Sequence, residues 1–436
     1  MRQCRCVPVH HISTAPVAAA TIVRASHPQP STTVTFIRSR QALLVAALLP
    51  ASLATAQSGK SAPAPDLSKS PAAVLMWNEA QKIAGFPHMD ALLPAHVVPH
   101  GTAVRALPAG KPIAAFAAGG DKAAMLDDYI ASQKVAGILV LQDGKIRLER
   151  YALGYSAAGR WTSFSVAKSV TSTLVGAAIK DGYIRSLDEP ITKYITQLKG
   201  SAYEGVTVRQ LLTMTSGVKW NEDYADPHSD IAQLYTVVPE PGVDANVSYA
   251  RRLTREAPPG TKWVYKTIET NLIGVLVMEA TKRPLADYLA EKIWKPAGME
   301  RDAAWGIDQI GHEQGGCCLM VSLHDYARIG QFIMEGAQVN GRSIVPDGWF
   351  AAATHKQADI GVPGSGYGYQ WWTNDDGTFA ARGIFGQMIY VDPRRNLVVA
   401  INSAWPVATV RAPSQARTAM LAAILAAVDA EGGAAR

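Results

Sequence analysis

Residues 165–179 form a run of small and aliphatic side chains in which Lys168 is the one charged residue. The run predicts a helix, and Asp181-Gly182 predicts its end, because glycine readily takes the left-handed conformation that terminates helices. A run with so little charge is typical of a buried element, where a lysine is costly. We therefore expect a buried helix in which Lys168 is the unusual residue.

Ser165 and Lys168 are three residues apart, so on a helix they share a face and lie one turn apart. A serine hydroxyl is a weak nucleophile until a base takes its proton, and a lysine whose pKa is lowered by burial can be that base. The helix N-terminus adds unpaired N–H groups and a positive dipole end. The pair therefore indicates nucleophilic catalysis. The alternative is a chance Ser-x-x-Lys spacing on an ordinary helix with an exposed lysine.

Four further segments follow this run in order, at residues 187–195, 206–217, 258–265 and 315–328. Their order and spacing resemble those of the serine β-lactamase and penicillin-binding superfamily, over residues 113–427. The chain is most similar to the class C-like branch, which contains esterases, D-aminopeptidases and the 6-aminohexanoate dimer hydrolases that cut nylon oligomers. The resemblance implies a β-lactamase/D,D-peptidase-like fold and catalysis through an acyl-enzyme.

The second motif of that family is Tyr-x-Asn, and the matching residues here are Tyr265-Lys266-Thr267. The resemblance implies that Tyr265 relays a proton to the leaving group and then helps to activate water. A nearby lysine cation can lower the pKa of a phenol toward a useful range. The alternative is a core tyrosine with a satisfied hydroxyl. Thr267 departs from the usual asparagine, although it keeps a hydrogen-bonding group that can bind substrate.

The third motif is Lys-Thr-Gly or His-x-Gly on a strand beside the cleft. We match it to Ile384-Phe385-Gly386, with Gln387 following. Gly386 fits because a side chain there would obstruct the substrate. The resemblance then implies an oxyanion hole made by the backbone N–H groups of Ser165 and Gln387, with Phe385 and Gly386 contacting substrate.

This third motif lacks the cation that the family uses to hold a substrate carboxylate. Neither Ile384 nor Phe385 can bind an anion, and both β-lactams and peptidoglycan stem peptides carry a carboxylate. The departure favours an ester or a linear amide as substrate. Arg382 is close in sequence, but side chains alternate between faces along a strand, so we do not expect it to replace the missing cation.

A polar and aromatic segment at residues 219–230 contains Tyr224. The related amidases carry a tyrosine on a loop that overhangs the cleft, and the resemblance implies that Tyr224 binds substrate in the same way. The alternative is a polar surface loop with scattered aromatic residues.

The first 56 residues are predicted to be a leader. Residues 42–54 form a short apolar stretch after Arg38 and Arg40, and an Ala-x-Ala cleavage pattern ends at residue 56. The stretch is too short for a membrane span, so it predicts a signal peptide and a periplasmic or secreted protein without stable membrane insertion after cleavage. A retained membrane anchor is the alternative for this segment.

Without the leader the chain is nearly neutral. The leader holds five of the 42 basic residues and no acidic ones, which leaves 37 basic residues against 36 acidic ones. We find no basic and aromatic pattern typical of nucleic-acid binding and expect no such partner. The oligomeric state is not readable from the sequence.

Two cysteines, Cys317 and Cys318, remain after the leader, next to each other in the chain. We expect them to be small buried residues, since neighbouring cysteines form a disulfide only in a strained loop. Two ligands are too few for a metal site, and the histidines show no metal-binding spacing. No metal and no cofactor are predicted.

The periodicity predicts the organisation of the rest of the chain. Residues 57–72 resemble a flexible linker, and the segment 57–112 is expected to wrap the domain that follows at 113–430. A strand pair with a turn at Asp143-Gly144 precedes a helical subdomain at about 165–245; strands return near 385–403, and a last helix covers about 414–430. The fold class is therefore α/β of the α+β type, an antiparallel sheet flanked by helices with an all-helical insertion.

The leading hypothesis is a serine hydrolase that cleaves an ester or linear amide of a small molecule through an acyl-enzyme on Ser165. A β-lactamase or D,D-peptidase would use the same chemistry on another substrate. A non-catalytic envelope protein that keeps the fold is the alternative from another class, because the second and third motifs are altered.

Overall fold

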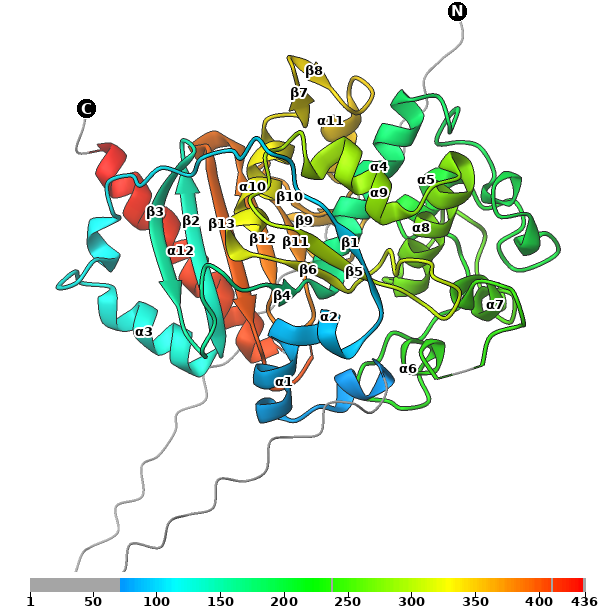
Figure 1. Ribbon diagram of the computed structural model, residues 1–436, viewed down its shortest axis with the longest axis horizontal. Helices are drawn as coiled ribbons and strands as arrows, with labels where there is room; N and C mark the ends of the chain where they lie inside the picture. Colours follow the sequence, from blue (N-terminus) through cyan, green and yellow to red (C-terminus); the bar gives the residue numbers. More distant parts are fainter. Residues whose placement is uncertain (1–70, 237, 409–410, 434–436) are drawn as a thin grey trace, which may run out of the picture. The chain divides into compact units, whose positions relative to one another are not determined.

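The computed structural model describes residues 71–236, 238–408 and 411–433. Its centre is a seven-stranded sheet with the strand order β3-β2-β13-β12-β11-β10-β9, in which every neighbouring pair is antiparallel (Figure 1). The strands are β2 (Val135–Gln142), β3 (Lys145–Tyr151), β9 (Ser365–Tyr367), β10 (Trp372–Asn374), β11 (Phe379–Arg382), β12 (Met388–Asp392) and β13 (Leu397–Ser403).

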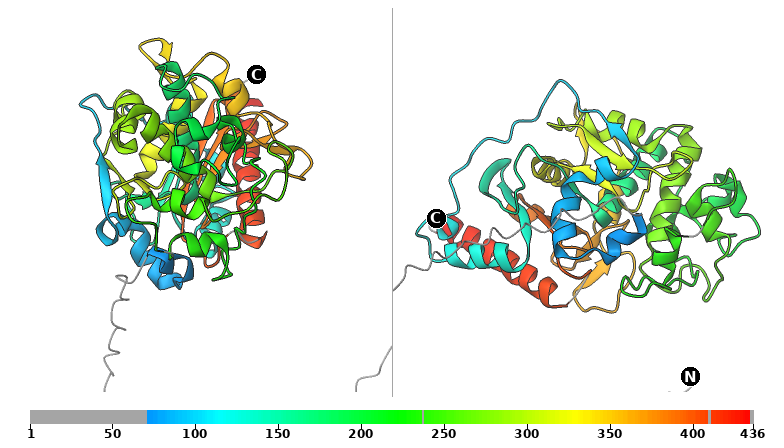
Figure 2. Two further views of the ribbon diagram at one scale, coloured as in Figure 1. Left: turned by 90° about the vertical axis from the view of Figure 1, so that its right-hand side faces the viewer. Right: turned by 60° about the horizontal axis from the view of Figure 1, so that its bottom comes forward.

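Helices cover both faces of this sheet because its central strands are apolar on both sides. On β2, Leu139 and Leu141 belong to the core under α10 (Leu323–Met334). Ile138 and Val140 point the other way, toward α3 and α12. Figure 2 shows α3 (Ala123–Ser132) and α12 (Arg411–Gly433) lying side by side.

The predicted strand pairs are confirmed. Asp143 and Gly144 both have positive φ angles, +51° and +72°, as a two-residue hairpin turn requires. Asn396, at φ +47°, ends the short helical turn Pro393–Arg395 between β12 and β13. The last helix is also confirmed, although it begins three residues earlier and ends three residues later than predicted.

Most of the remaining helices gather on one side of the sheet (Figure 1). They are α4 (Ala167–Lys180), α5 (Val208–Leu212), α6 (Asp230–Leu234), α7 (Ala245–Ala250), α8 (Thr267–Thr281) and α9 (Leu285–Leu289). The helical region thus continues past the predicted limit near residue 245. The reason is α8, which packs against α4 and has few exposed side chains, so it shows no amphipathic pattern that marks it as a helix.

A second, four-stranded sheet ties the N-terminal segment to the domain, in the order β1-β5-β6-β4. Its strands are β1 (Ala95–Val98), β4 (Trp161–Thr162), β5 (Ala303–Gly306) and β6 (Leu319–Val321). The shorter elements are α1 (Glu79–Gly85), α2 (Met89–Leu92), β7 (Gln338–Val339), β8 (Arg342–Ser343) and α11 (Trp349–Ala353). The predicted leader at 1–56 and the linker up to residue 70 lie outside the described residues. Over the described ranges, no helix combines the length and the apolar character needed to cross a bilayer.

The contact between α10 and the sheet gives a stability prediction. A Cβ added to Gly330 on α10 would lie 2.6 Å from Val398 Cγ1 and 2.8 Å from Ile389 Cγ2, whereas a Cβ at Gly432 on α12 would meet no atom within 4 Å. Both Gly→Ala changes favour the helix, but only Gly330→Ala overpacks the core. We expect Gly330→Ala to be less stable than Gly432→Ala by about 1–3 kcal/mol in denaturant unfolding. Equal stability of the two variants would contradict this packing.

Candidate active site

Ser165 lies in a one-turn helix (Phe164–Val166) between β4 and α4, so the regular helix begins two residues after it. The preceding residue, Phe164, has a φ of +42°, which is rare for a bulky side chain. Its ring packs against Phe86 and Phe385 with centroid distances of 5.0 Å to each. Ser163 joins the turn to β6, because its N–H donates to Leu319 O at 2.8 Å. These contacts hold the backbone of the nucleophile turn.

Lys168 is buried, as predicted, with 1% of its surface exposed. Its Nζ donates to Thr267 Oγ1 at 3.1 Å and to the Gly316 carbonyl at 2.8 Å. Burial lowers the pKa of Lys168 to about 8, and the negative charge of Glu222 opposes that fall. The neutral amine is therefore available near neutral pH, as a general base requires.

Tyr265 lies beside both residues. Lys168 Nζ is 5.5 Å from the centre of its ring. Burial raises the pKa of Tyr265 above its usual value, Glu222 raises it further, and the nearby Ser165 hydroxyl only partly offsets these effects. The expectation of a lowered phenol pKa is therefore wrong. The tyrosine stays neutral, so it can pass a proton on but does not act as a stored phenolate.

Glu222 was not singled out by the sequence analysis. It accepts hydrogen bonds from Thr267 N at 2.9 Å, from the Thr267 hydroxyl, from Trp220 Nε1 and from Tyr224 OH at 2.7 Å. Its carboxylate thus occupies the N-terminus of α8, where negative charge is favourable. An acid within a polar loop is usually solvated, so the sequence around Glu222 gives no sign of its role. The sequence feature that could have indicated a nearby polar partner is Thr267, whose short side chain leaves room for one.

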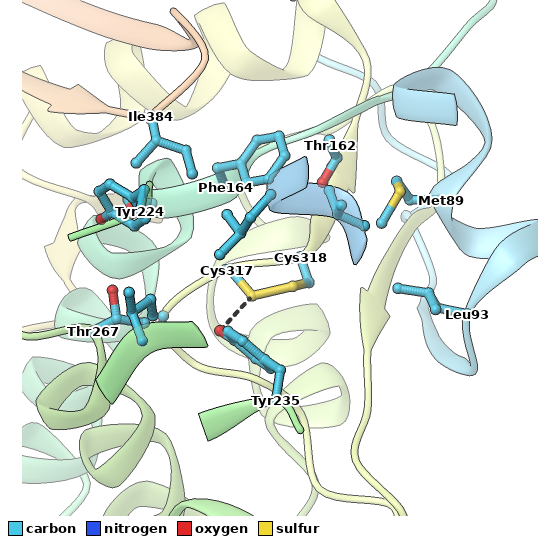
Figure 3. A pocket seen from close by; sticks show the side chains of 15 residues that line it. Met89, Leu93, Thr162, Phe164, Tyr224, Tyr235, Thr267, Cys317, Cys318 and Ile384 are labelled. Atoms are coloured by element: carbon cyan, nitrogen blue, oxygen red, sulfur yellow. Dashed lines mark hydrogen bonds between the residues drawn. A yellow bond between two sulfur atoms is a disulfide. The ribbon is translucent and has the colours of Figure 1, made fainter. Parts of the chain in front are cut away.

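A small pocket of about 70 Å³ opens beside Ser165 (Figure 3). Most of its lining is apolar. The lining residues are Val74, Leu75, Met89, Leu93, Thr162, Phe164, Ser165, Tyr224, Ile231, Tyr235, Thr267, Gly316, Cys317, Cys318 and Ile384. The structure therefore brings the predicted residues Tyr224 and Thr267 to the same pocket as Ser165.

The roles predicted for Phe385, Gly386 and Gln387 in the third motif need a correction. Phe385 and Gln387 are fully buried, and the Gln387 side chain donates to Ser403 O at 2.9 Å. A Cβ on Gly386 would lie 2.5 Å from Trp405 Nε1 and 2.8 Å from Ser403 Cβ. None of the three lines the pocket, because the turn between β11 and β12 directs them into the core.

Gly383 and Ile384, which come three residues before Gly386 and Gln387, lie beside the nucleophile turn instead. A Cβ on Gly383 would lie 2.9 Å from Ser163 O, so the two segments approach closely there. Ile384 lines the pocket with Ser165, and its N–H has no acceptor among the described residues. Ile384 is thus better placed than Gln387 to supply the second oxyanion-hole N–H.

A wider cleft of about 650 Å³ shares Tyr224 and Ile384 with the small pocket and is lined by Tyr265, Arg382 and Arg417. Arg382 therefore faces the cleft, contrary to expectation. Its guanidinium lies 5.3 Å from the Trp372 ring centre, and that of Arg417 lies 4.8 Å from the Trp405 ring centre.

Both guanidiniums keep unused hydrogen-bond donors. Arg382 Nε and Arg417 Nη1 are buried without a hydrogen-bond partner, and among the described residues neither arginine has a carboxylate within ion-pair distance. Burial and, to a smaller extent, the Arg417 charge lower the pKa of Arg382 to about 10. Such a pair of cations is suited to an anionic group of a ligand.

Cys317 and Cys318 form a disulfide, so the expectation of two free buried cysteines is wrong. A disulfide between neighbouring cysteines requires an unusual loop, and Cys318 does have a φ of +69°. The loop is held by Asn271 Oδ1, which accepts from Gly316 N at 2.7 Å, and by Trp305 Nε1, which donates to Cys317 O at 3.1 Å. Across the described ranges, no group of three histidine, cysteine or acidic side chains could hold a metal ion.

Several known proteins resemble this chain in sequence or in fold. The 6-aminohexanoate-dimer hydrolase of Paenarthrobacter ureafaciens is 29% identical over 283 residues, which is 62% of this chain and 72% of that protein. A structure from Bacillus anthracis, provisionally described as a 6-aminohexanoate-dimer hydrolase, superposes with a TM-score of 0.70 at 24% identity and covers 80% of this chain and 94% of its own. EstCE1, a hydrolase with promiscuous acyltransferase activity, gives a TM-score of 0.56 at 14% identity, over 69% of this chain and 97% of its own.

These structural matches confirm the predicted fold, an antiparallel sheet flanked by helices. The family model described as Beta-lactamase matches residues 123–424, which is more than half of the chain. The chain therefore belongs to the beta-lactamase family.

Proposed function

We propose that the protein is a serine hydrolase that cleaves a linear amide or an ester through an acyl-enzyme on Ser165. The observation that carries the proposal is the environment of Lys168, a buried amine with a lowered pKa one turn from Ser165. A lysine with a purely structural role would be expected to keep its charge and pair with an acid.

Acylation would begin with neutral Lys168 taking the Ser165 proton as Oγ attacks the carbonyl carbon. The N–H groups of Ser165 and Ile384 would stabilise the oxyanion of the tetrahedral intermediate. Neutral Tyr265, whose ring lies beside Lys168, would pass a proton to the leaving amine or alcohol, and the proton held by Lys168 would then replace it. Water would hydrolyse the acyl-enzyme by the same path in reverse.

The site also indicates which side of the substrate lies where. Tyr265 lines the wider cleft and is absent from the lining of the small pocket, so the group that it protonates lies in the cleft. The acyl group then occupies the small apolar pocket. Arg382 and Arg417 in the cleft favour a leaving group that carries a carboxylate, which fits the dimers of an amino acid named for the hydrolase relatives.

We further propose that the enzyme is periplasmic or secreted. The signal-peptide pattern in residues 38–56 supports this location, and the disulfide between Cys317 and Cys318 suits an oxidising compartment.

The first prediction concerns the nucleophile. A fluorophosphonate probe should add one adduct to the wild-type protein and none to Ser165→Ala, which should also lose more than about 99% of p-nitrophenyl ester hydrolysis. Intact mass spectrometry measures the adduct, and Ser132→Ala, at an exposed serine on α3, should label like the wild type. A wild-type protein that neither labels nor hydrolyses any ester would favour a non-catalytic envelope protein.

The second prediction concerns pH. Because neutral Lys168 is the base, the labelling rate should rise with pH and show an inflection near 8. Glu222 raises the pKa of Lys168, so Glu222→Gln should move the inflection to lower pH. Asp223→Asn, which neutralises an exposed neighbour, should leave it in place. An unchanged inflection in Glu222→Gln would mean that Lys168 is not the titrating base.

The third prediction concerns substrate charge. Arg417→Gln should lower kcat/KM for amides whose leaving group carries a carboxylate by about 10–100-fold, the usual loss for a charge-assisted hydrogen bond. The methyl esters of the same substrates should be nearly unaffected. The melting temperature should not fall, because the variant removes a buried charge that has no acidic partner. Equal losses on charged and neutral substrates would contradict the role of the cation.

A labelled penicillin tests the β-lactam alternative, since stable acylation of Ser165 would favour it.

A further inference from the structure

The disulfide between Cys317 and Cys318 lies between two cavities. Both cysteines line the small pocket that contains Ser165 (Figure 3). Cys318 also lines a separate cavity of about 200 Å³, on the side of Asn246, Asp308 and Gln309. Leu93 and Tyr235 are the other residues shared by the two cavities. Cys318, Leu93 and Tyr235 therefore form a partition between them.

Hydrogen bonds hold Cys318 and Tyr235 of this partition, together with Cys317. Cys318 O accepts from Gly306 N at 3.0 Å, and Cys317 O accepts from Trp305 Nε1 at 3.1 Å. The Tyr235 hydroxyl lies 3.7 Å from Cys317 Sγ, and since a disulfide sulfur has no proton, the tyrosine is the donor. The S–S bond itself removes the rotation that two free cysteine side chains would have.

We propose that this disulfide ends the acyl pocket and thereby sets the length of the acyl chain that the enzyme accepts, an inference that rests on the proposed function. A pocket of about 70 Å³ has room for on the order of five water-sized groups, which is a short acyl chain. Beyond the partition lies a cavity of about 200 Å³, so a longer chain would fit if the partition opened.

The disulfide loop also touches the catalytic base, because the Gly316 carbonyl next to Cys317 accepts from Lys168 Nζ at 2.8 Å. A change at the cysteines can therefore alter the rate as well as the selectivity. The two effects are separable, since a displaced Lys168 slows all esters alike, whereas an opened partition changes the ratio between long and short acyl chains.

The experiment compares p-nitrophenyl esters from acetate to decanoate on the wild type and on the double variant Cys317→Ala/Cys318→Ala. We expect the wild type to prefer short chains and the variant to gain roughly fourfold in relative kcat/KM for each further methylene that enters the second cavity. Treatment of the folded wild type with a phosphine reductant should shift the profile in the same direction, and the reductant should not affect the double variant.

The controls separate this inference from the proposed function. Fluorophosphonate labelling of Ser165 should persist in the wild type, the reduced wild type and the double variant. Labelling with an unchanged chain-length profile in both the reduced protein and the variant would overturn the partition while leaving the hydrolase intact. Two free thiols in the purified wild type, detected as two alkylations by mass spectrometry, would overturn it as well. No labelling of the wild type would overturn both proposals. If the double variant does not fold, the reduced wild type alone decides.

Discussion

The side-chain amine of Lys168 is buried, and distant segments of the chain must supply its polar contacts. A buried amine loses its hydration and needs other partners. Two are present, Thr267 Oγ1 at the start of α8 and the Gly316 carbonyl in the loop before β6. Three segments that are far apart in the sequence therefore meet at one nitrogen atom. Ser165 lies just before α4, which carries Lys168. The contacts that satisfy the buried amine therefore also help to fix the position of the nucleophile.

Glu222 opposes the effect of burial on the pKa of Lys168. Burial lowers the pKa of Lys168, while the carboxylate of Glu222 raises it, and the result near 8 leaves both protonation states accessible. Burial is the main cause of the raised pKa of Tyr265, and the same carboxylate raises it further, so the phenol stays neutral. The lysine can therefore act as the base and the tyrosine as the proton relay. Its bond to the Thr267 N–H shows why threonine suits this position: the helix N-terminus binds the acid, and the short side chain bridges the acid to the lysine.

The buried helix and its Ser-x-x-Lys pair were predictable because both depend on local spacing and on the absence of charge. Tyr265 could be placed through the resemblance. The oxyanion-hole N–H was assigned to Gln387, three residues after Ile384. The reason is that the segment 383–387 is a turn, so the alternation of side chains along a strand does not apply within it. The same error hid Arg382, which lines the cleft with Arg417 from the distant α12. Glu222 and the disulfide were not predicted for another reason. An acid in a polar loop is usually solvated, and neighbouring cysteines are usually small buried residues. Only tertiary contacts, around Lys168 for Glu222 and around Tyr235 for the disulfide, make these two cases unusual.

The division of the site into a closed pocket and an open cleft follows from the same contacts. The pocket is bounded by the loop that carries the Gly316 carbonyl, so its wall cannot move far without disturbing the base. In the cleft, Arg382 and Arg417 lie against tryptophan rings with donors unused, and neither donates to a residue that contacts Lys168. Changes at these two arginines can therefore alter the leaving group that is accepted at little cost to the chemistry, whereas changes in the pocket act on selectivity and rate together. We infer that the specificity of this chain is more easily altered on the leaving-group side than on the acyl side.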